Sequence, residues 1–331
     1  MTEPRLDVLA IGNAIVDVIA DADDAFLEAE GLAKGSMRLI DAHEATRLYD
    51  HMGPAREASG GSAGNTAAGV AALGGRAGFI GQIADDQLGE VFSHDIRSIG
   101  VEFETPPQDF GTPTARCLVL VTPDAQRTMS TFLGAAQHLP ADALDPVQIE
   151  QSAILYLEGY LWDPEAPRAA MQQAIEIARA AKRQVAFTLS DSFCIQRHRD
   201  GFLKLIRGGF LDILFANEAE IRELTGETDF ETAVRAVQDQ VRTLVVTRSE
   251  KGAIAVRGGE RAEVRAEPVG QVVDTTGAGD LFAAGFLFGE ARGRGLETSL
   301  RIGAVAAAEV ISHYGARPQA DLKALVAERL G

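Results

Sequence analysis

The run Asp274–Gly285 reads DTTGAGDLFAAG and places a carboxylate, Asp280, directly behind a glycine turn and ahead of an apolar segment. Gly277 and Gly279 allow a sharp backbone turn. The free N–H groups and positive dipole end of a following helix bind anions. A carboxylate repels a phosphate, so Asp280 makes sense there as the acceptor of a nucleophile's proton. The run predicts a phosphate-transfer site, and an ordinary turn or helix N-cap is the alternative.

Two other phosphate-binding motifs are excluded. The run Gly277–Gly279 opens like a dinucleotide fingerprint, but Phe282 occupies the third small position and the run lies late in the chain. No GxxxxGK[ST] run occurs in the sequence, so a Walker-type loop is absent. What remains is a glycine turn that leads into a helix.

A second glycine run, Ser59–Ala67, reads SGGSAGNTA and precedes a predicted helix of small residues. Gly60 and Gly61 would let the backbone approach a ligand closely. Asn65 offers a donor and acceptors for polar groups such as sugar hydroxyls. The run therefore predicts a loop that binds a hydroxyl-bearing substrate.

The segment Gly12–Asp17 ends the first predicted strand and contributes two more polar side chains. Asn13 and Asp17 can point into the same crevice as the second glycine run. A carboxylate is a good acceptor for paired sugar hydroxyls. The alternative for Asp17 is a solvated turn residue.

A third polar run, Asn217–Glu220, follows the strand-like segment Asp212–Ala216. Asn217 and Glu220 are three residues apart and share one helical face, where they could order a hydrated Mg²⁺ through its water molecules. The alternative is a solvated helix start whose acidic residues complement the dipole.

Short apolar runs alternate with helical patterns along the chain and predict a doubly wound, mostly parallel α/β sheet flanked by helices. Pro167–Lys182 has the apolar spacing of an amphipathic helix. Ligands bind such sheets beyond the carboxyl ends of the strands. The predicted strands are Leu6–Gly12, Ala77–Ile83, Ala153–Leu157, Val185–Leu189, Asp212–Ala216 and Thr243–Thr247.

Two segments, residues 14–50 and 105–133, interrupt this alternation with turn residues and alternating stretches. Arg116–Val121 and Arg127–Phe132 form the arms of a predicted hairpin. We interpret both segments as a small β lobe inserted into one domain of residues 1–331. Such a lobe could close over substrate and exclude water, and a fixed edge sheet is the alternative.

Composition narrows the function classes. The 331 residues are 46% hydrophobic and 24% charged, as in a globular protein. A net charge of −17 argues against nucleic-acid or membrane surfaces but permits a small anionic ligand in a locally positive pocket. Two cysteines and six scattered histidines indicate neither a disulfide scaffold nor a zinc site. With no apolar stretch long enough for a membrane span, we expect a cytoplasmic enzyme that is a monomer or a homodimer.

Three of these runs together resemble a known family. Gly60–Gly89 and Asp274–Leu287 resemble the two signatures of the PfkB or ribokinase family of carbohydrate and nucleoside kinases, and Asn217–Glu220 matches its NxxE motif. The resemblance extends over nearly the whole chain and is strongest to the adenosine kinases. It implies a ribokinase-like fold with a small β-sheet lid, and transfer of the γ-phosphoryl group of ATP to a nucleoside, with Mg²⁺ bridging the phosphates.

The resemblance also implies roles for individual residues. Asp280 would accept the proton of a nucleoside 5′-hydroxyl, while the backbone of Gly277, Ala278 and Gly279 stabilises the moving phosphoryl group. Arg127, on the lid, would reach the phosphates. The positions that match substrate-binding residues are Asn13, Asp17, Gly60, Gly61, Asn65, Met129, Tyr160 and Phe193.

Further matching positions lie on the nucleotide side. The run Thr247–Gly252 resembles the family's TxGxxG run, with Ser249 in place of a glycine, and Thr247, Gly252, Asn217 and Glu220 would contact the nucleotide and its Mg²⁺. Asp274, Thr276 and Gly315 match a monovalent cation site, which would bind K⁺. Adenosine is the expected acceptor. Another nucleoside or sugar, and a nucleoside sensor without catalysis, are the alternatives.

Overall fold

The computed structural model describes residues 4–109, 111–124 and 126–331. Within these ranges, nine strands form one sheet in the order β14-β13-β12-β11-β10-β9-β1-β5-β6. The strands from β12 to β6 are parallel, and β13 and β14 complete the sheet as an antiparallel edge. Their bounds are β1 Leu6–Ile11, β5 Ala77–Ile80, β6 Val101–Phe103, β9 Ser152–Glu158, β10 Gln184–Thr188, β11 Ile213–Asn217, β12 Thr243–Thr247, β13 Ala253–Arg257 and β14 Glu260–Val264.

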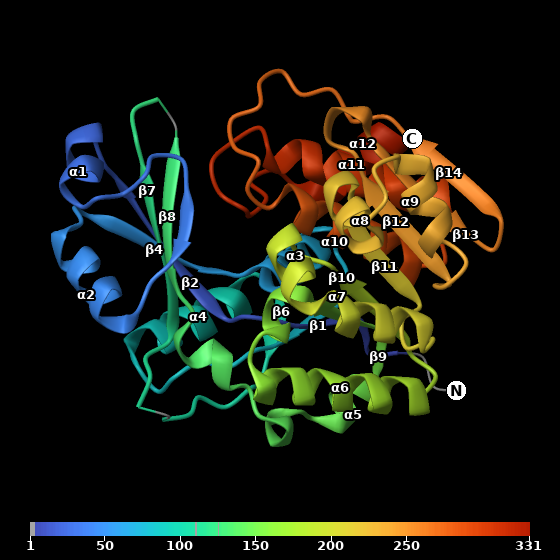
Figure 1. The fold of residues 1–331 in the computed structure, drawn as a ribbon, viewed down its shortest axis with the longest axis horizontal. Helices are drawn as coiled ribbons and strands as arrows, with labels where there is room; N and C mark the ends of the chain where they lie inside the picture. Colours follow the sequence, from blue (N-terminus) through green and yellow to red (C-terminus); the bar gives the residue numbers. More distant parts are fainter. Residues whose placement is uncertain (1–3, 110, 125) are drawn as a thin grey trace.

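Helices cover both faces of this sheet, which confirms the predicted doubly wound α/β class (Figure 1). One face packs against α5 Pro146–Glu150, α6 Glu165–Ala180, α7 Ser192–Arg207, α8 Glu218–Thr225 and α9 Phe230–Val237. The other packs against α3 Ser62–Ala72, α4 Gln87–Ser98, α10 Ala278–Ala291 and α11 Leu296–Val310, with α12 Leu322–Leu330 outside α11. All six predicted strands lie in the sheet, with ends that differ by up to three residues.

Side-chain alternation along β1 explains the two cores. Leu9 and Ile11 pack with α6 and α7, whereas Val8 and Ala10 pack with α3 and α10. Successive side chains of a strand point to opposite faces, so a continuous apolar run is what a strand covered on both faces requires. The helix α10 is buried over most of its length, and Asp280 in its first turn accepts from Ser62 of α3, next to Ala63, which donates to Glu158 at the carboxyl end of β9.

A second, small sheet lies to one side of the large one, at the left of Figure 1. Its five strands within the described ranges have the order β3-β8-β7-β2-β4. The predicted hairpin is present as antiparallel β7 and β8. The sheet also includes β4, which lies outside the expected segment 14–50. In the expected segment 105–133, the first strand of this sheet is β7, so residues 105–114 come before the sheet. The bounds are β2 Ile15–Asp21, β3 Met37–Leu39, β4 Ala55–Gly60, β7 Ala115–Val121 and β8 Arg127–Phe132.

The two faces of the small sheet differ in their surroundings. Val16 and Val18 on one face pack with Leu27 of α1 Asp24–Ala29 and Leu48 of α2 Ala42–His51. The other face carries Asp17, Met129 and Arg127, because directly paired residues share a face. Short 3₁₀ turns complete the described chain at η1 Gly134–His138, η2 Ala141–Ala143, η3 Gly159–Trp162 and η4 Ser249–Lys251. No helix in these ranges is long and apolar enough to cross a lipid bilayer.

Candidate active site

The carboxylate of Asp280 is held by the second glycine run. The Ser62 hydroxyl donates to Asp280 Oδ1 at 2.6 Å, and Asn65 Nδ2 donates to Oδ2 at 3.0 Å. The Oδ1 atom of Asn65 is buried without a hydrogen-bond partner among the described residues. Desolvation raises the pKa of Asp280, against the lowering effect of these two hydrogen bonds and of Arg317. The two predicted glycine runs therefore meet at one carboxylate.

The N-terminus of α10 is open. Gly277 is the N-cap residue in the left-handed conformation (φ 79°), and no side chain caps the helix. A Cβ at Gly277 would lie 2.7 Å from the Cβ of Ala316, so only glycine fits. The N–H groups of Gly279 and Asp280 donate no hydrogen bond within the described ranges, whereas Ala278 N–H donates to the Thr275 carbonyl at 3.2 Å. This terminus presents the free donors that an anion requires.

Glu158, at the end of β9, connects the first strand with the second glycine run. One oxygen accepts from the backbone and side-chain N–H groups of Asn13, both at 2.7 Å, and the other accepts from Ala63 N–H at 2.8 Å. Burial raises the pKa of Glu158 to about 7, although these hydrogen bonds lower it. Sequence reasoning missed Glu158, because no motif surrounds it. A lone acid at the end of an apolar strand was the available signal.

Arg317 is a second residue that sequence reasoning missed. Its guanidinium donates to the Ser59 carbonyl at 2.7 Å and to the Gly64 carbonyl at 3.0 Å. Ser59 in turn donates to Asp95 from its N–H and its hydroxyl. Desolvation lowers the pKa of Arg317 to about 10, while Asp95, Asp17 and Asp280 raise it. Arg317 therefore supplies positive charge beneath the second glycine run.

Asp17 lies on the face of the small sheet that carries Arg127. Its carboxylate packs tightly on Gly60, where an added Cβ would lie 2.5 Å from Oδ2. Desolvation raises the pKa of Asp17 to about 6, with Arg317 and Arg127 acting to lower it and Asp280 to raise it. The positive charge of Arg317 therefore lowers the pKa of both Asp17 and Asp280.

Gly61 and Met129 complete the predicted substrate positions on this side. Gly61 is the N-cap of α3 with φ 86°, and a Cβ there would lie 2.2 Å from the Asn13 carbonyl oxygen. Met129 lies in β8 opposite Val119, two residues from Arg127 on the same face. The second glycine run and the small sheet thus border the same space.

An ion pair joins the small sheet to the first glycine run described above, Asp274–Gly285. Arg127 Nη1 lies 2.7 Å from Asp274 Oδ2, and the two side chains are 9% and 6% exposed. Asp274 also accepts from the N–H and hydroxyl of Thr276 and from Gly315 N–H. The three positions expected at a cation site are therefore adjacent, and the cation on Asp274 is the guanidinium of Arg127.

Tyr160 and Phe193 lie beyond the ends of β9 and β10. The Tyr160 hydroxyl donates to the Ser190 carbonyl at 3.3 Å, and burial raises the pKa of this tyrosine. Phe193, in the first turn of α7, is 67% exposed. The two rings make no ring contact with each other among the described residues. Phe193 is thus an apolar ring that is available to a ligand.

The run Asn217–Glu220 forms a complete capping box at α8. Asn217 Oδ1 accepts from the N–H groups of Ala219 and Glu220, and the Glu220 carboxylate accepts from the backbone and side-chain N–H groups of Asn217. Desolvation raises the pKa of Glu220 to about 7. No cluster of three or more His, Cys, Asp or Glu side chains within the described ranges could hold a metal ion. The Asn217 and Glu220 side chains therefore suit contact with a metal ion through its bound water, not direct coordination of the ion.

The loop after β12 contains the departure from the family pattern. Thr247 ends the strand, and the loop closes with a hydrogen bond from the Arg248 N–H to the Gly252 carbonyl at 2.8 Å. Ser249 has φ 51°, a left-handed conformation that favours the glycine found in the family. Ser249 therefore holds a conformation that a glycine would adopt without strain.

Comparison with protein families matches residues 7–322 to the pfkB family of carbohydrate kinases. The chain belongs to this family. It is thus a phosphotransferase that acts on a hydroxyl group. The crystal structure of adenosine kinase from Sinorhizobium meliloti is 52% identical with a TM-score of 0.90, covering 99% of this chain and 100% of that one.

Two further proteins that this chain resembles are a probable sugar kinase and another adenosine kinase. The crystal structure of a probable sugar kinase from Rhizobium etli is 46% identical with a TM-score of 0.91, covering 98% of this chain and 99% of that one. An adenosine kinase from Saccharomyces cerevisiae is 28% identical over 340 residues, covering 95% and 96% of the two chains. The full-length matches confirm the ribokinase-like fold.

Proposed function

We propose that this pfkB kinase transfers the γ-phosphoryl group of ATP to the 5′-hydroxyl of adenosine, giving AMP and ADP. The observation that carries the proposal is the Asp280 carboxylate, held by Ser62 and Asn65 beside the uncapped N-terminus of α10. A proton acceptor and an anion site are what phosphate transfer to an alcohol requires.

Asp280 acts as the general base. The 5′-hydroxyl gives its proton to the carboxylate as its oxygen forms a bond to the γ-phosphorus, and the bond between that phosphorus and the β,γ-bridging oxygen breaks, so that ADP leaves. Burial raises the pKa of Asp280, which strengthens it as a base. The hydrogen bonds from Ser62 and Asn65 fix its direction.

The N-terminus of α10 stabilises the moving phosphoryl group. The N–H groups of Gly279 and Asp280 are free to donate to it. Arg127 leaves Asp274 and contacts the phosphates when the small sheet moves as a lid. The buried pair at 2.7 Å supports this role, because it already places the guanidinium beside the first glycine run.

When bound, Mg²⁺ would neutralise charge on the phosphates, and Glu220 and Asn217 would contact it through its water. K⁺ as an activator requires the cluster of Asp274, Thr276 and Gly315 to admit a second cation beside Arg127 or in its place. On the nucleotide side, Thr247 and Gly252 border the ATP phosphates. Such a reaction would serve purine salvage in the cytoplasm.

Two observations favour adenosine as the acceptor, the similarity of the chain to an adenosine kinase and the presence of aromatic side chains that suit a flat base. The chain is 52% identical to the adenosine kinase of S. meliloti along its whole length. Asn13, Asp17, Gly60, Gly61 and Asn65 then bind the ribose. Tyr160, Phe193 and Met129 contact the base, and aromatic faces stack well on a flat nucleobase.

A second candidate is a sugar or another nucleoside as acceptor, which the 46% identity to the probable sugar kinase of R. etli favours. A nucleoside sensor without catalysis is disfavoured by the Asp280 geometry. Rates of ADP formation with adenosine, inosine, guanosine, cytidine, ribose and fructose 6-phosphate decide between these functions. Adenosine should give the highest kcat/KM, and no rate above background with adenosine would refute the proposal.

A further inference from the structure

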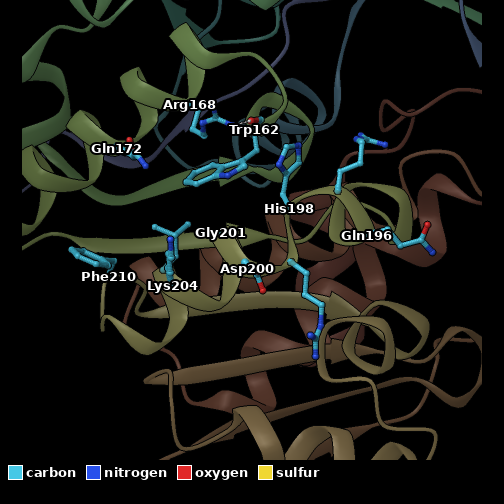
Figure 2. Close-up of a pocket in the computed structure, with 12 residues that line it drawn as sticks. Trp162, Arg168, Gln172, Gln196, His198, Asp200, Gly201, Lys204 and Phe210 are labelled. Carbon is cyan, nitrogen blue, oxygen red and sulfur yellow. Dashed lines mark hydrogen bonds between the residues drawn. The ribbon is translucent and has the colours of Figure 1, made fainter.

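A groove of about 660 Å³ lies between α6 and α7, on the face of the large sheet away from α10 (Figure 2). It is lined by four permanently charged cations and one carboxylate, Asp200. This is a local excess of positive charge in a chain of net charge −17. The cations are Arg168, Arg197, Arg199 and Lys204.

The indole N–H of Trp162 is an unused donor at the wall of this groove. The side chain is 3% exposed, and its Nε1 donates no hydrogen bond to any described residue. A Cβ at Gly201 would lie 3.1 Å from Nε1, so the missing side chain leaves this donor uncovered. Figure 2 shows Trp162 and Gly201 among the residues that line the groove. The indole N–H is therefore a donor with no protein acceptor at the groove wall, and it is available to an acceptor on a ligand.

Two of the cations retain free donors. Lys204 makes no ion pair or hydrogen bond through its ammonium group within the described ranges, and Arg168 donates only to the Trp162 carbonyl, at 3.3 Å. Phe210, near Lys204 in Figure 2, is 42% exposed and offers an apolar surface. The groove thus combines cationic and neutral donors with an exposed ring.

We propose that this groove binds a phosphorylated small molecule, whose phosphate accepts hydrogen bonds from Lys204, Arg168 and the Trp162 indole. A volume of this size accommodates a nucleoside monophosphate. Two or more cationic donors and a neutral N–H suit a phosphate dianion. Free phosphate, a sugar phosphate and a nucleotide share this chemistry, and Phe210 would favour the nucleotide.

The groove is connected to the proposed nucleoside site through Asp163. This carboxylate pairs with Arg197 at 2.7 Å and contacts His198, where α7 leaves helical geometry. Asp163 directly follows η3, which carries Tyr160, and the first half of α7 carries Phe193. One short segment of chain, from Tyr160 to Asp163, therefore runs from the proposed nucleoside site to the groove.

Trp162 is the sole tryptophan in the sequence, so intrinsic fluorescence reports on the groove itself. Titration of the full chain with AMP, ribose 5-phosphate and inorganic phosphate, at constant ionic strength, should give a saturable change in tryptophan emission for at least one of them. Lys204→Glu should weaken that binding at least about tenfold. Lys323→Glu on α12 is the matched control and should bind as the wild type does.

Gly201→Ser tests the indole donor without changing any charge and should also weaken binding. A titration that is flat for all three probes, or equal in wild type and Lys204→Glu, overturns the proposal, since an equal change would come from the catalytic site. The fluorescence result does not depend on whether adenosine is phosphorylated.

Discussion

The N-termini of α8 and α10 have the same layout in sequence and opposite structures. Each helix has an acidic residue three positions after its N-cap, Glu220 after Asn217 and Asp280 after Gly277. At α8 the acid turns back and closes a capping box with its own N-cap residue. At α10 the cap has no side chain, and the acid turns away to α3.

The difference decides what each terminus can bind. The side chains of α8 satisfy its first N–H groups, so a ligand gains little there. The N–H groups of Gly279 and Asp280 in α10 are left free beside a base, which suits a charged group that develops during reaction. The N-terminus of α10 is therefore open to an anion, whereas that of α8 is closed by its capping box and can contact a metal only through water. Both acids have a raised pKa, so that property alone does not separate them.

The sharpest test of this difference is Asp280→Asn. The amide keeps the size of the carboxylate but cannot accept the substrate's proton, so kcat should fall by about 10² to 10⁴. Binding of adenosine, measured by calorimetry, should change little, because the site keeps its shape. Turnover close to that of the wild type would show that another group takes the proton.

The next largest effect is expected from Gly277→Ala. The added methyl group would collide with Ala316, and an alanine would be strained at the left-handed φ of 79°. The turn must therefore shift, which misplaces the free N–H groups. Loss of such donors lowers kcat by about 10² to 10³. The melting temperature should also fall.

Gly279→Ala is the matched control, because no atom lies within 4 Å of the added Cβ. Its melting temperature should equal that of the wild type. A Gly277→Ala variant that keeps its kcat would mean that the α10 terminus is not the anion site.

Much of this layout could be predicted from sequence. The six parallel strands were found because a strand covered on both faces must be a continuous apolar run. The strand β4 reads AREASG and was missed, since its first residues are exposed and polar. The second glycine run follows β4 of the small sheet and the run with Asp280 follows the antiparallel edge strand β14, so their contact through Ser62 and Asn65 appears only in the folded structure.

The remaining site residues could not be found in this way. Glu158 and Arg317 act through contacts with residues at least 95 and 253 positions away in the chain. Neither stands in a short motif, so only the folded structure joins them to the glycine runs. Sequence reasoning also did not foresee that Arg127 occupies the carboxylate of Asp274.

At the closed N-terminus of α8 we expect an effect of pH on stability. The folded-state pKa of Glu220 is about 7, above its ordinary 4.5, so the folded protein binds this proton more tightly than the unfolded chain. The tighter proton binding raises the free energy of unfolding by at most about 3 kcal/mol. This stabilisation is fully present below pH 4.5 and is lost as the pH rises through about 7.

Glu220→Gln should remove that pH dependence, which urea unfolding at about pH 5 and about pH 8 measures. Glu223→Gln, on the same helix, is the control and should keep the wild-type profile. Identical profiles in wild type and Glu220→Gln would contradict the assignment of the titrating group to the closed terminus.

A smaller effect is expected from Asn217→Ala. Loss of the cap should lower the free energy of unfolding by about 1 kcal/mol, and Asn217→Ser, which keeps an accepting oxygen, by a few tenths. If α8 contacts the water of a nucleotide-bound Mg²⁺, the KM for Mg·ATP should rise about tenfold while kcat changes less. An unchanged KM would make α8 a purely structural terminus.

The smallest effect concerns Ser249, where this chain puts a side chain on a backbone that favours glycine. Its φ of 51° costs about 1–2 kcal/mol for a residue other than glycine. Ser249→Gly relieves that strain but gives the unfolded chain more freedom, at a cost of about 0.4–1 kcal/mol. We therefore expect a net gain near 0.5 kcal/mol in the free energy of unfolding, measured by urea denaturation. Glu250→Gly next to it has no such strain to relieve and should destabilise, so equal losses in both variants would show that the strained turn stores no energy.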